Sequence, residues 1–221
     1  MTDAHCHLVR GETRHFVCGD GATGPADVRF CGLHPWEFLA ARELSDFGAI
    51  ERRLADDSHL GVGEIGLDRL KVRDIPQTMR DAFEAQLALA AKWRRPVVLH
   101  GAKCWGQVVK ACMPYAGKIP SFLFHGFSRS DGLLPDIVKM DGFISIGPAI
   151  LNDHAVNYRK LAAKIPADHL LVESDATLEN DGETPHVNEI FAKLAEIRGV
   201  AAEDIAQRIE ANADRFVESL K

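Results

Sequence analysis

The sequence predicts an α/β protein with the fold of a (β/α)8 TIM barrel, distorted because its first two helices are missing. Short runs of apolar or β-branched residues recur eight times along the 221 residues, and most are followed by a longer amphipathic stretch. A doubly wound parallel sheet would give a similar alternation, so the pattern alone leaves both folds open. No repeat, low-complexity segment or linker divides the chain, and residues 1–221 are expected to form one barrel domain.

The predicted strands are short apolar segments bounded by turn residues. In chain order they are residues 2–7, 14–18, 28–34, 59–66, 96–100, 121–125, 142–147 and 169–174. Apolar residues at helical spacing predict helices at 42–57, 76–95, 104–113, 133–140, 154–165, 186–199 and 203–220. Only LVRGET separates the first two strands and GDGATGPAD the next two, and neither is long enough for a packed helix.

Composition narrows the possible environments and partners. No apolar run approaches the roughly 20 residues that span a bilayer, and the polar start excludes a signal peptide there, so we expect a cytoplasmic protein without a membrane partner. The five cysteines are an odd count without zinc-knuckle spacing, which favours reduced thiols. A net charge of -6 argues against a broad basic surface that coats nucleic acid. It leaves room for a local site in which metal ions and a few basic residues supply positive charge.

Metal-ligand residue types stand at the ends of five predicted strands. Within MTDAHCHL, Asp3, His5 and His7 occupy every second position, so they project from one face of a strand. All strand ends lie on the same face of a parallel barrel, where ligands from distant segments meet. The six residues expected there are His5, His7, Glu64, His100, His125 and Asp175.

Four imidazoles and two carboxylates suit divalent ions such as zinc, manganese, magnesium or nickel, and six ligands exceed the need of one tetrahedral ion. We therefore expect two ions, with Glu64 between them. The first-strand histidines and Asp175 would hold one, and His100 with His125 the other. A strand-end histidine taken alone is more often a hydrogen-bonding residue, but the coincidence of six such residues favours metal binding and hydrolysis.

Seven motifs in order along the chain, DAHCH, GLHPW, GEIGLD, PVVLHG, FHGFS, ESDAT and NADRF, resemble the TatD family of metal-dependent hydrolases in the amidohydrolase superfamily. The resemblance implies a distorted TIM barrel, two metal ions and DNase activity, often 3′ exonuclease action on single strands. It implies the same six ligands, with Glu64 and Asp175 as the catalytic carboxylates and Asp175 taking a proton from the nucleophilic water. TatD proteins commonly have H-x-R where this chain has HGAKCW, and the missing helices resemble a compact branch of the family.

Five further residues follow predicted strands and are candidates for substrate binding. Trp36 could stack on a base or simply pack within its loop, and His34 and Asp68 could contact substrate or support the metal ligands. Lys103 and Arg129 each follow a metal ligand by a few residues, so they could bring positive charge to an anionic substrate. Both could equally be solvated surface charges.

The leading hypothesis is a two-metal phosphodiesterase, a deoxyribonuclease acting on DNA ends, with DNA or another phosphodiester as its partner. A metal-dependent hydrolase of a small ester, amide or lactone is the first alternative, because this chemistry and fold serve many substrates. The second alternative is a non-enzymatic binding module that keeps the barrel fold. The sequence leaves the oligomeric state open.

Overall fold

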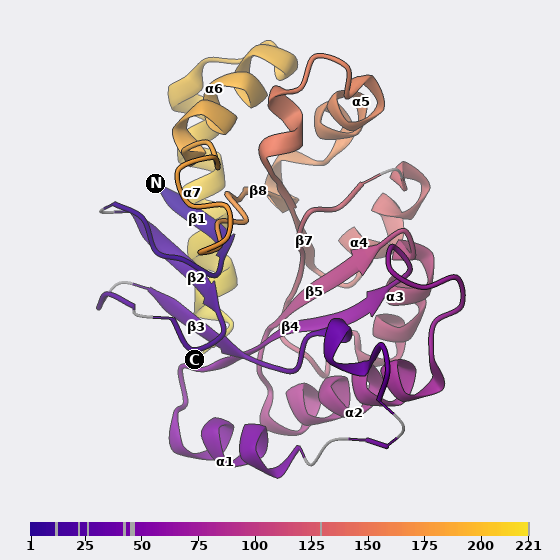
Figure 1. The fold of residues 1–221 in the computed structure, drawn as a ribbon. Coiled ribbons are helices and arrows are strands. Elements are labelled where there is room, and N and C mark those ends of the chain that lie inside the picture. Colours follow the sequence, from indigo (N-terminus) through magenta and orange to yellow (C-terminus); the bar gives the residue numbers. More distant parts are fainter. Residues whose placement is uncertain are drawn as a thin grey trace.

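The barrel is built from eight parallel strands that follow one another in chain order (Figure 1). The computed structural model describes residues 1–11, 13–21, 23–25, 27–41, 43–44, 47–128 and 130–220. The strands are β1 (Thr2–Cys6), β2 (Arg14–Cys18), β3 (Val28–Cys31), β4 (Gly61–Asp68), β5 (Val97–Ala102), β6 (Phe122–Phe124), β7 (Gly142–Ile146) and β8 (Leu170–Val172). Each overlaps a predicted strand. The predicted TIM-barrel fold is confirmed.

Hydrogen bonds between the end of β1 and the segment after β8 bring the two edges of the sheet together. The backbone N–H of Asp175, just beyond β8, donates to the carbonyl of His5 at 3.1 Å. The N–H groups of His7 and Leu8 donate to the carbonyl of Ala176 at 2.8 and 3.0 Å. These bonds join the carboxyl ends of β1 and β8, which is where the predicted ligands of both strands lie.

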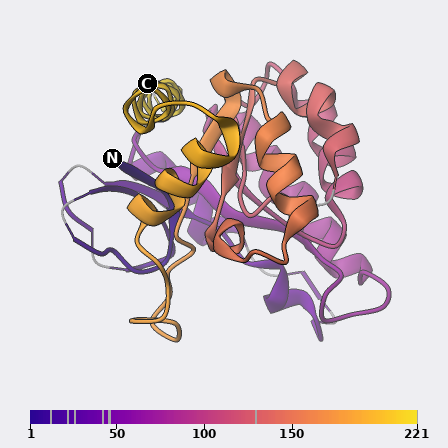
Figure 2. The same ribbon diagram turned by 90° about the horizontal axis from the view of Figure 1, so that it is seen from above.

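Helices alternate with the strands only from β3 onward. They are α1 (Gly48–Asp56), α2 (Gln77–Trp93), α3 (Trp105–Cys112), α4 (Leu134–Lys139), α5 (Val156–Lys164), α6 (Val187–Arg198) and α7 (Ala202–Glu218). No described residue between β1 and β2, or between β2 and β3, is helical, as the short connections predicted. Seen from above, the magenta and pink helices lie on the side away from the indigo strands, whereas the yellow C-terminal helix stands beside the N-terminus (Figure 2).

The C-terminal helix α7 packs against the amino ends of the strands. Asn212 donates to the carbonyls of Ala167 and Leu170 at 2.7 and 2.9 Å, just before and at the start of β8. Phe216 stacks on Phe16 of β2 with ring centroids 5.4 Å apart, and its ring lies 6.1 Å from that of Phe30 of β3. This helix therefore supplies apolar contacts to β2 and β3 at the end of the barrel away from the ligands.

Two further features concern the cysteines and the helices. All five cysteines are buried and free. None of the helices in the described ranges combines the length and the apolar character needed to cross a membrane.

Candidate metal centre and its flanking pockets

The first strand carries two histidines into the mouth of the barrel. His5 is fully buried, and its ring meets that of His7 edge to face at 5.0 Å. Cys6, between them, faces the other way and packs with Val17 and Ala176, as the period of two predicts. Asp3 does not join the histidines. Its carboxylate accepts hydrogen bonds from the backbone N–H and hydroxyl of Ser174 at 2.9 and 2.5 Å, and so binds β1 to the segment after β8.

Glu64 of β4 lies at the centre of the site, buried among imidazoles. Its Oε1 is 2.7 Å from both His100 Nδ1 and His125 Nε2. Its Oε2 is 3.2 Å from His7 Nε2 and 3.4 Å from His5 Nε2. Burial by itself would raise the pKa of Glu64, but the charge of His125 and hydrogen bonds from neighbouring imidazoles hold it well below the ordinary value. The carboxylate is therefore ionised, with one oxygen toward each group of histidines.

Asp175 reaches the same site from the end of β8. Its side chain is 51% exposed, and Oδ1 lies 3.6 Å from His5 Nε2. Its backbone adopts a left-handed conformation, with φ of 51°. Such a conformation costs a non-glycine residue about 1 kcal/mol or more, so the surrounding contacts must hold it. The bond to the His5 carbonyl and a bond from Asn180 Nδ2 to the Asp175 carbonyl, at 3.2 Å, provide that support.

Three groups of ligand-type atoms lie close enough among the described residues to hold a metal ion, each with its atoms within 4.8 Å of one another. The first is the predicted group from β1 with Asp175, and the second joins His5 to Glu64 and His125. The third brings His34, predicted as a substrate contact, together with Glu64 and His100. Glu64 belongs to two of the three groups. The structure thus brings all six predicted ligands together and adds His34 to them.

The donor atoms fit a divalent cation. Within the part of the chain that the structure describes, both ring nitrogens of His5 are buried without a hydrogen-bond partner, and so is Nδ1 of His125. Buried polar groups in proteins are almost always hydrogen-bonded, and an exception requires an explanation such as an ion. His7 differs, because its Nδ1 lies 3.0 Å from the carbonyl of Cys18 and only its Nε2 is directed to Glu64. Imidazole nitrogens beside an ionised carboxylate are ligands that such ions accept.

Asp68 and Trp36 surround His100 on the outer side of the site. Asp68 Oδ2 lies 3.0 Å from His100 Nε2 and accepts a hydrogen bond from Trp36 Nε1 at 2.7 Å. Burial alone would raise the pKa of Asp68, but hydrogen bonds from His100, Trp36 and the Leu70 N–H lower it strongly. Asp68 is fully buried and orients His100. Trp36 is 45% exposed at the mouth, with Lys71 Nζ 3.3 Å above its ring.

Glu173 is a site residue that the sequence reading missed. It is buried, accepts a hydrogen bond from the hydroxyl of Ser145, and places Oε1 3.6 Å from His125 Nδ1. Burial lowers the pKa of His125, but the charges of Glu64 and Glu173 raise it well above the ordinary value. The same negative field would attract a metal cation. The sequence did contain a signal, because Glu173 lies within the predicted strand 169–174, two residues before Asp175, which is the spacing at which side chains of a strand share a face.

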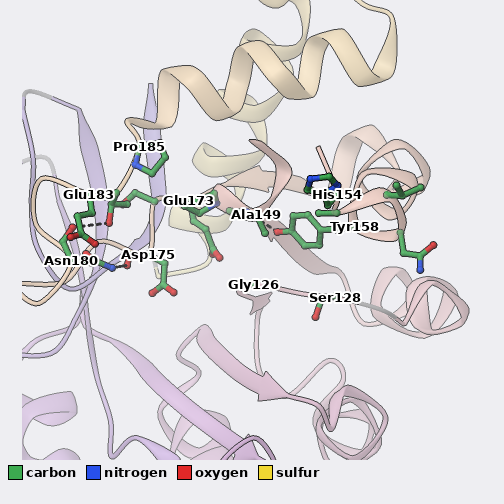
Figure 3. A pocket seen from close by; sticks show the side chains of 17 residues that line it. Gly126, Ser128, Ala149, His154, Tyr158, Glu173, Asp175, Asn180, Glu183 and Pro185 are labelled. Atoms are coloured by element: carbon green, nitrogen blue, oxygen red, sulfur yellow. Dashed lines mark hydrogen bonds between the residues drawn. The ribbon is translucent and has the colours of Figure 1, made fainter. Parts of the chain in front are cut away.

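Two hollows flank Asp175. The first, of about 740 Å³, is lined by the segments after β6, β7 and β8 (Figure 3). The second, of about 900 Å³, is lined by the segments after β4, β5 and β6, and includes His100, His125 and the exposed Lys103. Gly126, Ser128 and Asp175 line both. Arg129, the other predicted cation, lies outside the described residues.

Comparison with known proteins identifies the family. Residues 25–218 match the family described as TatD related DNase. The chain belongs to the TatD family. A protein of Dickeya dadantii named 3′-5′ ssDNA/RNA exonuclease TatD is 30% identical over 198 residues, covering 84% of this chain and 74% of that protein. A Bacillus subtilis protein named uncharacterized metal-dependent hydrolase YabD is 24% identical over 192 residues, covering 84% and 75%.

Solved structures show the same fold. The crystal structure of YJJV, a TatD homologue from Escherichia coli, superposes with a TM-score of 0.78 at 24% identity, covering 92% of this chain and 85% of that one. A TatD-family hydrolase from Entamoeba histolytica gives a TM-score of 0.67 at 14% identity, covering 92% and 84%. This TatD protein is a metal-dependent hydrolase, and the ligand groups described above support the use of divalent metal.

Proposed function

We propose that this TatD protein is a two-metal phosphodiesterase that removes nucleotides from the 3′ ends of single-stranded DNA. The observation that carries the proposal is the position of Glu64, whose two oxygens face different groups of histidines, with Oε1 toward His100 and His125 and Oε2 toward His5 and His7. A carboxylate in this position suits a bridge between two ions. The relatives named 3′-5′ ssDNA/RNA exonuclease support a phosphodiester as the bond that is cleaved and the 3′ end as the place where cleavage begins.

The ligand groups divide between the two proposed ions. His5, His7 and Asp175 would hold the first ion, and Glu64 would be a ligand of both ions. The second would be held by the histidines that face Glu64 Oε1, namely His100, His125 and His34. When bound, the ions would polarise the phosphodiester and lower the pKa of a water molecule, which is the chemistry that paired divalent ions supply.

The chain's own carboxylates would then move the proton and hold the ligands. Asp175 is half exposed and borders both hollows, so its carboxylate can accept the proton of the attacking water at an Oδ atom. Glu173 and Asp68 would keep the rings of His125 and His100 in place through their contacts to Nδ1 and Nε2.

Hydrolysis of a small neutral ester, amide or lactone is the alternative. Arg69 and Lys103 line the larger hollow beside His100 and His125, which favours an anionic substrate. A phosphodiester keeps negative charge on its oxygens throughout displacement and gains from nearby cations, whereas a neutral carbonyl compound gains little.

The test uses the full chain, freed of metal with a chelator and then reloaded with zinc, manganese or magnesium. Elemental analysis is expected to give two ions per chain, and the loaded protein is expected to shorten a linear single strand but leave a circular strand of the same composition intact. Turnover of neutral esters or amides with no cleavage of any oligonucleotide would reject the proposal. A single ion per chain in an active enzyme would reject its two-metal part.

A further inference from the structure

The two hollows beside Asp175 differ in charge. In the described lining of the larger hollow, Arg69 and Lys103 provide positive charge on the side of His100. The smaller hollow has no lysine or arginine in its described lining, and it has three carboxylates, Glu173, Asp175 and Glu183. Because both hollows border Asp175, a substrate bound across this residue would place chemically different parts in the two hollows.

Three basic residues lie near the smaller hollow but are not part of its described lining. Arg10 contacts the loop that lines it, because its guanidinium donates to the carbonyls of Thr184 and Asn180 at 2.9 and 3.3 Å and forms an ion pair with Asp181 at 2.7 Å. Lys160 and Lys164 line a separate hollow, which shares only Asn157 with this one, and Lys164 forms an ion pair with Asp131 at 2.6 Å.

Of the three carboxylates, Asp175 is a proposed metal ligand and Glu173 faces His125. Glu183 is therefore the lining carboxylate that the metal centre does not use, and His154 is the ionisable group on the other side of the hollow (Figure 3).

The walls of the smaller hollow offer an apolar side and a polar side. Figure 3 shows Tyr158 and Ala149 on one side and Asn180 and Glu183 on the other, with Asp175 between them. Pro148 and Val156 add to the apolar lining. The Tyr158 hydroxyl accepts a hydrogen bond from the backbone N–H of Gly147 at 2.9 Å, which fixes the aromatic ring. A flat base could pack on the apolar side while a sugar hydroxyl donates to the carboxylates.

We propose that the smaller hollow binds the uncharged terminal nucleoside of the strand and that Glu183 in its lining disfavours a phosphorylated end. The inference rests on the proposed nuclease function and adds substrate selection to it. The strand's phosphates would extend past Arg69 and Lys103 in the larger hollow, where cations meet them. A terminal hydroxyl can donate to Glu183, whereas a terminal phosphate would face like charges that it cannot pair with.

The experiment compares kcat/KM of the metal-loaded full chain on two oligonucleotides that differ only in having a 3′-hydroxyl or a 3′-phosphate. We expect the hydroxyl end to be favoured by about tenfold or more, the size of effect that one unfavourable like-charge contact produces. Glu183→Gln is expected to narrow this ratio by about threefold or more, because it removes a lining carboxylate while preserving the side-chain shape. A 5′-phosphate on the far end of the same strand is expected to change the rate by less than about twofold, since it lies outside the hollow.

Glu179→Gln is the matched control. Glu179 lies on the same segment and is exposed, but it does not line the hollow, so its replacement makes the same charge change without touching the subsite. Equal rates on the two 3′ ends, or equal effects of Glu183→Gln and Glu179→Gln, would overturn the subsite and leave the nuclease function standing. Absence of cleavage of every oligonucleotide by the loaded wild-type chain would overturn both.

Discussion

Replacement of His5 by phenylalanine should make the metal-free protein more stable while abolishing part of its stabilisation by metal. His5 is fully buried, and neither ring nitrogen has a hydrogen-bond partner among the described residues. Its ring stacks on that of His125 with centroids 4.0 Å apart, a contact that phenylalanine can keep. Glu64 retains its closer partners, His100 and His125, both at 2.7 Å. The substitution therefore removes unpaired nitrogens and a metal ligand together.

The stability that the variant gains without metal and the metal-induced stability that it loses should be similar in size. An unpaired buried polar group costs about 1–3 kcal/mol, so in chelator the melting temperature of His5→Phe should rise by about 2–4 °C for each kcal/mol relieved in a chain of this length. An ion present at about 100 times its dissociation constant stabilises the wild type by about 2.7 kcal/mol, or roughly 5–10 °C. The variant should lack the rise in melting temperature that comes from the ion that His5 would hold.

Thermal unfolding of both proteins, with chelator and with added manganese or zinc, measures these shifts. His5→Leu is a second variant, because a phenylalanine ring is larger than imidazole and overpacking would mask the gain. A loss of stability in chelator for both variants, with the metal-induced shift intact, would refute the reasoning and make His5 a structural residue.

His15 provides the matched control, because it is equally buried but fully hydrogen-bonded. Its Nδ1 lies 3.0 Å from Asp27 Oδ1, and its Nε2 lies 3.0 Å from the Arg10 carbonyl. His15→Phe removes these bonds, together with the contacts of Nε2 to the Thr13 hydroxyl and the Arg10 N–H, and should cost about 2 kcal/mol or more with or without metal, since each hydrogen bond contributes about 1 kcal/mol. Its metal-induced shift should match that of the wild type.

Four further predictions concern the residues around the centre. Asp175→Asn should lower kcat by about 100-fold or more with little change in KM, and near-normal turnover would remove its role in proton transfer. Lys103→Ala should retain the metal, weaken oligonucleotide binding and reduce the slope of log affinity against log salt by about one, whereas Lys110→Ala, an exposed lysine on α3, should change neither. Glu173→Gln should weaken metal binding by about 10–100-fold in an isothermal titration, and an unchanged affinity would contradict its support of His125. Asn180→Ala removes the bond to the Asp175 carbonyl and should lower kcat while leaving the melting temperature nearly unchanged. A lower melting temperature with normal kcat would indicate a purely structural role.

The sequence alone was sufficient to predict the positions of the strands and which end of the barrel carries the site. Strand periodicity is a local property, so the alternation of His5, Cys6 and His7 already predicted which side chains share a face, and the structure agrees. The parallel order of the strands directs β4 and β8 the same way, so Glu64 and Asp175 meet at one mouth, although Glu64 lies in the middle of β4, which continues to Asp68 instead of ending at residue 66 as predicted. The short connections around β2 likewise predicted the absence of two helices.

The pairing of atoms across the barrel mouth was decided only by the tertiary structure. Asp3 shares a strand face with the first-strand histidines, yet it bonds Ser174 and leaves the centre. His34 comes within 3.4 Å of Glu64, and Glu173 within 3.6 Å of His125, across segments far apart in the sequence. These contacts depend on how the closed sheet staggers its strands and how the loops fold over its end, which no local period encodes. The difference in charge between the two hollows arises in the same way, because each is lined by segments from several strands that meet only when the barrel forms.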